Sequence, residues 1–232
     1  MSREIKSYNV NDMQYKIIAI SVQGDKEKNN QDYFKIYCDS DNLIVSVTDG
    51  LGSARMSEYG SRYACEECEN LLKNSEKFNF DKFFANWNAR IEGNILDYDS
   101  TLKFIKIDNS SIYLWKIGDG WTALFKEGEL IELENKENFL NRTDSILSVG
   151  ANQSWKDMTC EKCDNFICVL ATDGFSEDII KNNSKEFLCE VKNEMDNNFE
   201  KFAYDLENFM INWPLKTNLD DKTVVFIRGA KI

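Results

Sequence analysis

Five acidic motifs in this sequence lie where a strand-like segment ends or turns. They contain Asp32 in NNQDYF, Asp49 in VSVTDGLGS, Asp119 in WKIGDGWTAL, Asp173 in VLATDGFSE, and the pair Asp220 and Asp221 in NLDDKTVVFI. Carboxylates at strand ends can converge above a sheet, and Mg²⁺ and Mn²⁺ prefer such oxygen ligands. Gly50 follows Asp49, and its missing side chain lets a backbone carbonyl approach a cation as well. The sequence therefore predicts a divalent-cation site built from carboxylates.

An Asp-Gly pair also forms ordinary turns, and for any single pair that is the simpler interpretation. Asp49 and Asp173 differ because each follows an apolar β run that ends in the same way, VSVTDG and VLATDG. This repeated strand end favours a chemical function for both carboxylates.

The composition excludes several kinds of chemistry. The 232 residues include no histidine, so Ser-His-Asp hydrolysis, Cys-His nucleophiles and His-ligated zinc are not available. A net charge of −12 argues against nucleic acid as a partner, because phosphate backbones are bound through Lys and Arg, and equally against an anionic membrane. An acidic protein can still act on phosphate groups if metal ions supply positive charge locally.

The cysteines and the N-terminal segment indicate a reducing compartment. Seven cysteines in a chain with no secretory signal are expected to be thiols. The two CxxC pairs, Cys65/Cys68 and Cys160/Cys163, lie far apart, so we interpret them as small buried side chains rather than zinc ligands. No apolar run reaches the length of a membrane span. We therefore expect a cytoplasmic protein.

The elements that must position the acidic residues are mostly strands, with helices in two groups. Predicted strands cover 15–22, 33–38, 43–48, 101–107, 111–117, 121–126, 129–133, 166–172 and 223–228. Predicted helices cover 56–72, 80–95, 184–195 and 199–211. This order favours an α+β sandwich over a parallel doubly wound sheet, and the length suits a single domain, 1–232.

The chain resembles the metal-dependent protein phosphatases of the protein phosphatase 2C family over nearly its whole length. The segments that carry the resemblance are GDKEKNNQDYF, VTDGLGSARMSEYGSRYA, STLKFIKIDNSSIYLWKIGDGWTALFKEGEL, ATDGFSEDI and DDKTVVFI. Each motif is weak evidence alone, but five in the family's order are strong evidence. The resemblance implies a four-layer αββα sandwich, with two antiparallel β-sheets flanked by pairs of helices.

The resemblance also implies a set of metal ligands, which are Asp32, Asp49, Gly50, Asp119, Asp173, Asp220 and Asp221. Asp49 would bridge two Mn²⁺ or Mg²⁺ ions, and Gly50 would give its carbonyl oxygen to one of them. Asp173 and one of the pair Asp220 and Asp221 would complete the first site.

Two further residues complete the implied site. Asp32 would serve the second ion directly or through water, and Asp119 resembles a residue associated with a third, looser ion. With Asp49, Asp173 and Asp32 as catalytic residues, the ions would activate a bridging water for direct attack on phosphoserine or phosphothreonine, without a phosphoenzyme. The implied partner is a phosphorylated protein, either a cognate kinase or its targets, and we expect a monomer.

The sequence departs from the family pattern in the groups that bind phosphate and donate protons. Gln31 stands where many members have Glu, and Glu27 stands where the family has a phosphate-binding arginine. Lys26, Lys28 or Arg55 could replace that arginine, although each is also a typical solvated charge. These departures leave two alternatives open: a weak or inactive member that binds phosphoproteins as a regulator, and a hydrolase of small phosphate esters.

Overall fold

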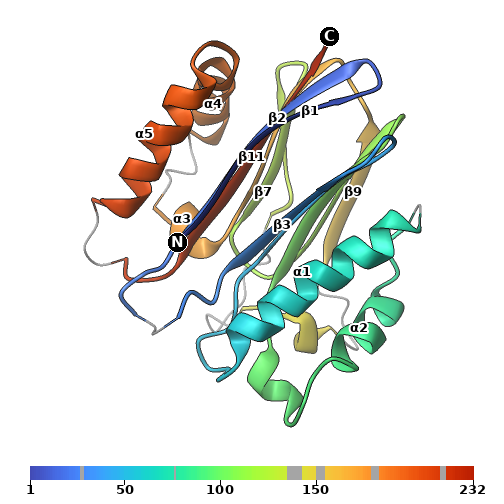
Figure 1. Cartoon of the computed structure of the whole chain (residues 1–232), viewed down its shortest axis with the longest axis vertical. Helices are drawn as coiled ribbons and strands as arrows, with labels where there is room; N and C mark the ends of the chain where they lie inside the picture. The colour runs from blue at the N-terminus through green and yellow to red at the C-terminus, as the bar shows by residue number, and fades with distance from the viewer. Residues whose placement is uncertain (27–28, 76, 135–142, 150–154, 179–182, 215–217) are drawn as a thin grey trace.

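Two antiparallel β-sheets stacked face to face form the centre of the computed structural model, with helices on both outer faces (Figure 1). The structure describes residues 1–232 except 27–28, 76, 135–142, 150–154, 179–182 and 215–217. In order across the six-stranded sheet, the strands are β1 (Ser2–Val10), β2 (Met13–Val22), β11 (Lys222–Lys231), β10 (Asn165–Ala171), β7 (Trp121–Lys126) and β8 (Glu129–Glu132). In order across the five-stranded sheet, they are β3 (Tyr33–Cys38), β4 (Leu43–Thr48), β5 (Leu102–Ile107), β6 (Ser111–Ile117) and β9 (Lys156–Glu161).

The alternation of side chains along the strands produces three apolar layers. In β2, Ile17 and Ala19 face the other sheet, whereas Ile18 and Ile20 face outward. In β4, Val45 faces the opposite sheet and Ile44 faces outward. Because successive side chains of a strand point to opposite faces, a strand that is buried on both sides is mostly apolar, apart from polar side chains that find a partner. This requirement explains the continuous apolar runs in the sequence.

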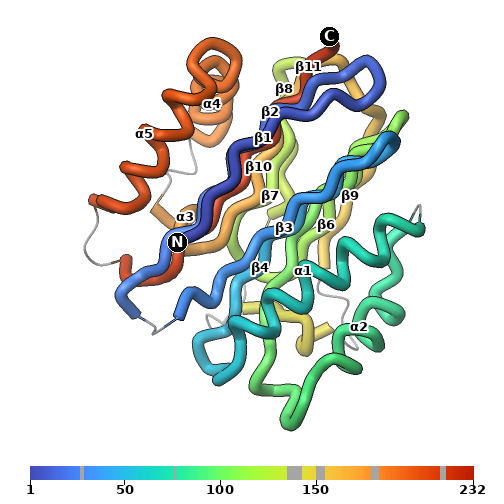
Figure 2. The backbone as a smooth tube through the Cα atoms, in the orientation of Figure 1, coloured from blue at the N-terminus to red at the C-terminus, as the bar shows by residue number. Residues whose placement is uncertain are grey.

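Helix pairs cover the two outer faces, as Figures 1 and 2 show. The helices are α1 (Ser57–Lys73), α2 (Phe80–Asn88), α3 (Asp173–Ser176), α4 (Ser184–Asn197) and α5 (Phe199–Ile211), with 3₁₀ turns at Ile95–Tyr98 and Ile146–Ser148. The first two helices pack on the five-stranded sheet, and α4 and α5 pack on the six-stranded sheet. The predicted αββα sandwich with two antiparallel sheets is therefore confirmed.

The structure differs from the sequence-based prediction at two edge strands and at the end of one helix. Strands β1 and β9 were not predicted, because both are sheet-edge strands that are mostly exposed or half-buried and lack a strong apolar pattern. The predicted helix 80–95 ends at Asn88. Gly93, with a φ of +101°, lies in the turn that follows, and the apolar Ile95 begins a separate 3₁₀ turn instead of continuing the helix.

The seven cysteines are all free thiols. Cys65, Cys68 and Cys168 are buried, and Cys160 and Cys163 pack at the edge of the core between the sheets. No group of three metal-type ligands within the described part of the chain includes a cysteine. None of the helices described here is both long enough and apolar enough to cross a bilayer.

Candidate metal centre

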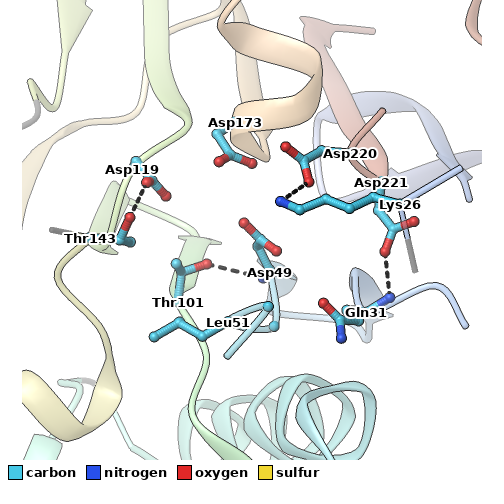
Figure 3. A pocket seen from close by; sticks show the side chains of 12 residues that line it. Lys26, Gln31, Asp49, Leu51, Thr101, Asp119, Thr143, Asp173, Asp220 and Asp221 are labelled. Atoms are coloured by element: carbon cyan, nitrogen blue, oxygen red, sulfur yellow. Dashed lines mark hydrogen bonds and ion pairs between the residues drawn. The ribbon is translucent and has the colours of Figure 1, made fainter. Parts of the chain in front are cut away.

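Segments that are distant in sequence bring acidic side chains to one pocket at the end of the two sheets (Figure 3). Asp49 directly follows β4, Asp119 lies in the turn between β6 and β7, Asp173 begins α3 after β10, and Asp220 lies just before β11. The pocket has a volume of about 190 Å³ and is lined by Lys26, Gln31, Asp49, Gly50, Leu51, Gly52, Thr101, Asp119, Thr143, Asp173, Asp220 and Asp221. The strand ends thus converge as the sequence motifs suggested.

Asp49, Asp119 and Asp173 form the centre of this pocket. Each offers one carboxylate oxygen, and these oxygens all lie within 4.8 Å of one another. Burial raises the pKa of Asp49 well above its usual value, and the negative charges of Asp32 and Asp173 raise it further. Burial and the charge of Asp119 likewise raise the pKa of Asp173. Three close carboxylates of this kind repel one another unless protons or cations neutralise them.

Hydrogen bonds fix the backbone of Asp49 and the carboxylates of Asp119 and Asp173. The Asp49 amide donates to Thr101 Oγ1 at 3.0 Å, and the Thr101 amide donates to the Asp49 carbonyl at 2.8 Å. The Thr143 hydroxyl donates to Asp119 Oδ2 at 2.6 Å. The Gly174 amide donates to Asp173 Oδ1 at 2.7 Å. Each acid is therefore fixed by its own neighbour, which leaves other carboxylate oxygens directed toward the pocket (Figure 3).

Asp32 lies behind the pocket wall and is only 6% exposed. Its Oδ2 accepts a hydrogen bond from the Thr172 hydroxyl at 2.8 Å, while its Oδ1 is buried without a hydrogen-bond partner among the described residues. Burial, followed by the nearby charge of Asp221, raises the pKa of Asp32 to about 7. The structure therefore places Asp32 close enough to interact electrostatically with the pocket acids, although it does not line the pocket itself.

The neighbouring residues Asp220 and Asp221 have different environments. Both oxygens of Asp221 accept backbone hydrogen bonds, from the Gly24 amide at 2.8 Å and from the Gln31 amide at 2.6 Å. Asp220 instead pairs with Lys26, whose Nζ lies 2.7 Å from Asp220 Oδ1 (Figure 3). Asp221 thus ties Gly24 and Gln31 to the start of β11, whereas the Asp220 carboxylate is held by the long side chain of Lys26.

The candidate phosphate-binding residues are not all brought to the pocket. Lys26 lines it and is the one basic residue that does so among the described residues. Arg55 does not line it, because its side chain is 86% exposed and pairs with Asp97 outside, at 3.8 Å. Lys28 and Glu27 lie outside the described residues. The structure therefore does not bring Arg55 to the pocket, since its guanidinium lies at the surface near the start of α1.

The donor set suits hard divalent cations. All side chains of the central cluster are carboxylates, which are typical ligands of Mg²⁺ and Mn²⁺ and differ from the Cys and His ligands of structural zinc. In the part of the chain that the structure describes, the buried oxygens Asp32 Oδ1 and Asp119 Oδ1 have no hydrogen-bond partner. A buried carboxylate oxygen without a partner is costly, so these atoms are consistent with a site that completes its contacts through cations and water.

The acidic motifs of the sequence did not reveal the neutral and basic residues that support the acids. Thr101, Thr143 and Thr172 each hydrogen-bond an acidic residue of the site, and Lys103 lies fully buried beside Thr101. A usable signal existed for two of them. Thr172 directly precedes Asp173, and Lys103 interrupts the otherwise apolar start of β5, where a buried charge requires a partner.

Comparison with known proteins gives a consistent result. The family model described as protein phosphatase 2C matches residues 24–210. No curated protein sequence matches the chain. The chain is similar in structure to RsbX in complex with magnesium, with a TM-score of 0.67 and 16% identity over 98% of this chain and 100% of that one.

Two further solved structures are similar. The catalytic domain of the serine/threonine protein phosphatase PstP in complex with two manganese ions has a TM-score of 0.64 and 17% identity, covering 94% of this chain and 100% of that one. The phosphatase domain of SpoIIE from Bacillus subtilis has a TM-score of 0.56 and 14% identity, covering 95% and 94%. At these identities the structural matches establish the fold, and the family assignment depends on the sequence model.

Proposed function

The chain belongs to the protein phosphatase 2C family, and from this premise we propose that it is a metal-dependent phosphatase that hydrolyses phosphoserine and phosphothreonine in proteins. The observation that carries the proposal is the cluster of Asp49, Asp119 and Asp173, whose oxygens lie within 4.8 Å of one another in an open pocket. Carboxylates with raised pKa values in a cleft are typical of functional sites.

The proposed metal ligands follow from the position of each residue. Asp49, Asp173 and Asp220 would hold the first cation, and Asp49 with the Gly50 carbonyl would hold the second, with Asp32 acting through water because it lies behind the wall. Asp119 would offer a looser position. When bound, a pair of divalent cations supplies a water of lowered pKa and positive charge for the phosphoryl group.

Asp221 has a structural role in this proposal. Both of its oxygens already accept hydrogen bonds from backbone amides, so they are less available to a cation than those of Asp220. By holding Gly24 and Gln31, Asp221 positions the segment that carries Lys26 into the pocket. These contacts support Asp220, rather than Asp221, as the proposed ligand.

Lys26 is the residue we propose for binding the substrate phosphate. Its ammonium lies in the pocket against Asp220, and a cation bound by Asp220 would compete with this ion pair and release the lysine toward an incoming phosphate. Because the chain has no histidine, the alkoxide that leaves must take its proton from water. Slow turnover is the expected consequence, since a positioned general acid contributes about 10²–10⁴-fold to rate.

The test is hydrolysis of p-nitrophenyl phosphate and of phosphoserine, phosphothreonine and phosphotyrosine peptides, with Mn²⁺ or with EDTA. We expect Mn²⁺-dependent release of phosphate, a preference for the first two peptides, and loss of turnover in Asp49→Asn. Asp205→Asn is the matched control, because Asp205 is an exposed residue of α5 and the substitution changes the net charge by the same amount. Equal activity in Asp49→Asn and the control would refute the proposed site.

The same assay separates a second candidate function. The absence of histidine and the ion pair that occupies Lys26 favour a weak or inactive member that binds a phosphoprotein as a regulator. A folded protein that binds Mn²⁺ but releases no phosphate from any of these substrates would support that candidate.

A further inference from the structure

A fully buried lysine lies directly behind the acidic pocket. Lys103 is the second residue of β5 and is 0% exposed. Its register partners are Val47 on β4 and Lys116 on β6. Because side chains alternate along a strand, Lys103 shares its face with Ile105 and lies on the side of β5 that faces the opposite sheet. An ammonium in such a place is costly unless negative charge is close by.

The contacts of Lys103 connect it to the pocket acids. Its Nζ donates to Thr101 Oγ1 at 3.1 Å, the same oxygen that accepts the Asp49 amide at 3.0 Å. On the other side it lies against Gly120, the residue after Asp119. A Cβ on Gly120 would come within 2.8 Å of Lys103 Cε, so the glycine leaves room for the ammonium next to the turn that carries Asp119.

Two other buried lysines of the same sheet show what a purely structural role looks like. Lys106, also on β5, donates to the carbonyls of Leu72 at 3.0 Å and Ser75 at 2.8 Å, where it fixes the end of α1. Lys116 donates to the carbonyl of Gly120 at 2.7 Å. The Lys103 ammonium has a single hydrogen bond within the described part of the chain, and its acceptor is a neutral hydroxyl.

The charge that offsets this ammonium comes from the acidic pocket. The positive charge of Lys103 opposes the effects that raise the pKa values of Asp49 and Asp173. The Lys103 ammonium forms no direct ion pair with a carboxylate among the described residues. Its interaction with the Asp49 and Asp173 carboxylates therefore acts at longer range, through the buried, low-dielectric region around Thr101. A buried charge in this position interacts with any cation in the pocket as well.

We propose that the Lys103 ammonium acts as a fixed positive charge of the metal centre and neutralises part of the negative charge of Asp49, Asp119 and Asp173. This charge weakens the affinity of the three carboxylates for divalent cations and limits the number of bound cations to two. This inference rests on the metal site of the proposed function. The physical reason is that a fixed positive charge repels mobile cations from the same carboxylates. The looser position at Asp119, next to Gly120, is the one that Lys103 disfavours most.

The test is to count the Mn²⁺ ions bound and to measure their affinity by equilibrium titration, for the wild type, Lys103→Met and Lys103→Arg. Methionine keeps most of the length of the side chain and removes the charge, whereas arginine keeps the charge. We expect Lys103→Met to bind Mn²⁺ about tenfold or more tightly, or to bind one further ion, because the repulsion is removed. Lys103→Arg should return to the wild-type number and affinity.

Lys106→Met is the matched control, because it removes a buried lysine from the same strand on the opposite face. It is expected to lower stability and to leave Mn²⁺ binding unchanged. Unchanged or weaker Mn²⁺ binding in folded Lys103→Met would overturn the proposal. If Lys103→Met does not fold, the wild-type count decides, since two ions support the inference and three refute it. A wild type that binds no Mn²⁺ would instead overturn the metal site itself.

Discussion

Replacing Asp32 by asparagine tests the electrostatics of the site without any assay of catalysis. Asp32 is 6% exposed, and its folded pKa is about 7, against a usual value of 3.8. Between about pH 4 and pH 7 the Asp32 carboxyl is therefore protonated in the folded protein and ionised in the unfolded chain. This contribution to stability is fully present below the unfolded pKa and is lost as the pH rises through the folded pKa.

The size of the effect follows from the two pKa values. The difference between about 7 and 3.8, at 1.36 kcal/mol for each pH unit, is about 4 kcal/mol in total. When the pH is lowered from 8 to 5, it ends about two units below the folded pKa of Asp32. The metal-free wild type therefore gains about 3 kcal/mol of stability over this range. The amide side chain of the Asp32→Asn variant does not titrate, so the variant cannot gain this stability.

The measurement is urea unfolding in EDTA at pH 5 and pH 8, for the wild type and for Asp32→Asn. The free energy of unfolding of the variant minus that of the wild type should be about 3 kcal/mol higher at pH 8 than at pH 5, because only the wild type gains stability at the lower pH. The exposed Asp205→Asn should show no such difference between the two pH values. A stability difference for Asp32→Asn that is the same at both pH values would refute the reasoning.

Three further predictions concern the same region. Asp221→Ala should lower the free energy of unfolding by about 1–3 kcal/mol in urea titrations, because two backbone amides lose their acceptor. Asp220→Ala should instead lose Mn²⁺ affinity with little change in stability, and the reverse pattern would exchange the roles of the two residues. Gly174→Ala should destabilise the fold by about 2–4 kcal/mol in the same assay, since its Cβ would lie 2.1 Å from the Asp221 carbonyl oxygen. Mn²⁺ should raise the melting temperature more at pH 8 than at pH 6, because carboxylates with raised pKa values must lose protons to bind the ion. An equal rise at both pH values would contradict this.

The fold could be predicted from sequence wherever one strong signal was present. The apolar runs before Asp49 and Asp173 identified buried strands, because a continuous apolar run is typical of a strand that is covered on both faces. Edge strands β1 and β9 gave no such signal, since one or both of their sides face solvent. The end of α2 was also hidden, because Ile91 and Ile95 continue the apolar pattern although they belong to a turn and a 3₁₀ segment.

The candidate site was predictable as a set of acidic residues but not as a geometry. Asp49 and Asp119 are 70 positions apart in the sequence, and their proximity depends on how the two sheets stack. The different environments of Asp220 and Asp221 could not be predicted either, because adjacent residues at a strand start point in opposite directions. The partners of each carboxylate depend on where Gly24, Lys26 and Gln31 lie, and these residues are distant in sequence.

The placement of the two lysines suggests how a chain with a net charge of −12 could manage a phosphorylated substrate. Lys26 is long, half-exposed and inside the pocket, where it pairs with Asp220, and we propose that it exchanges this partner for a phosphate. Lys103 is fixed and fully buried behind Thr101, where solvent does not screen it and no substrate can reach it. Because only the first can contact a ligand, their effects on catalysis should differ in kind: Lys26 should act on the affinity for substrate, and Lys103 on the affinity for cations.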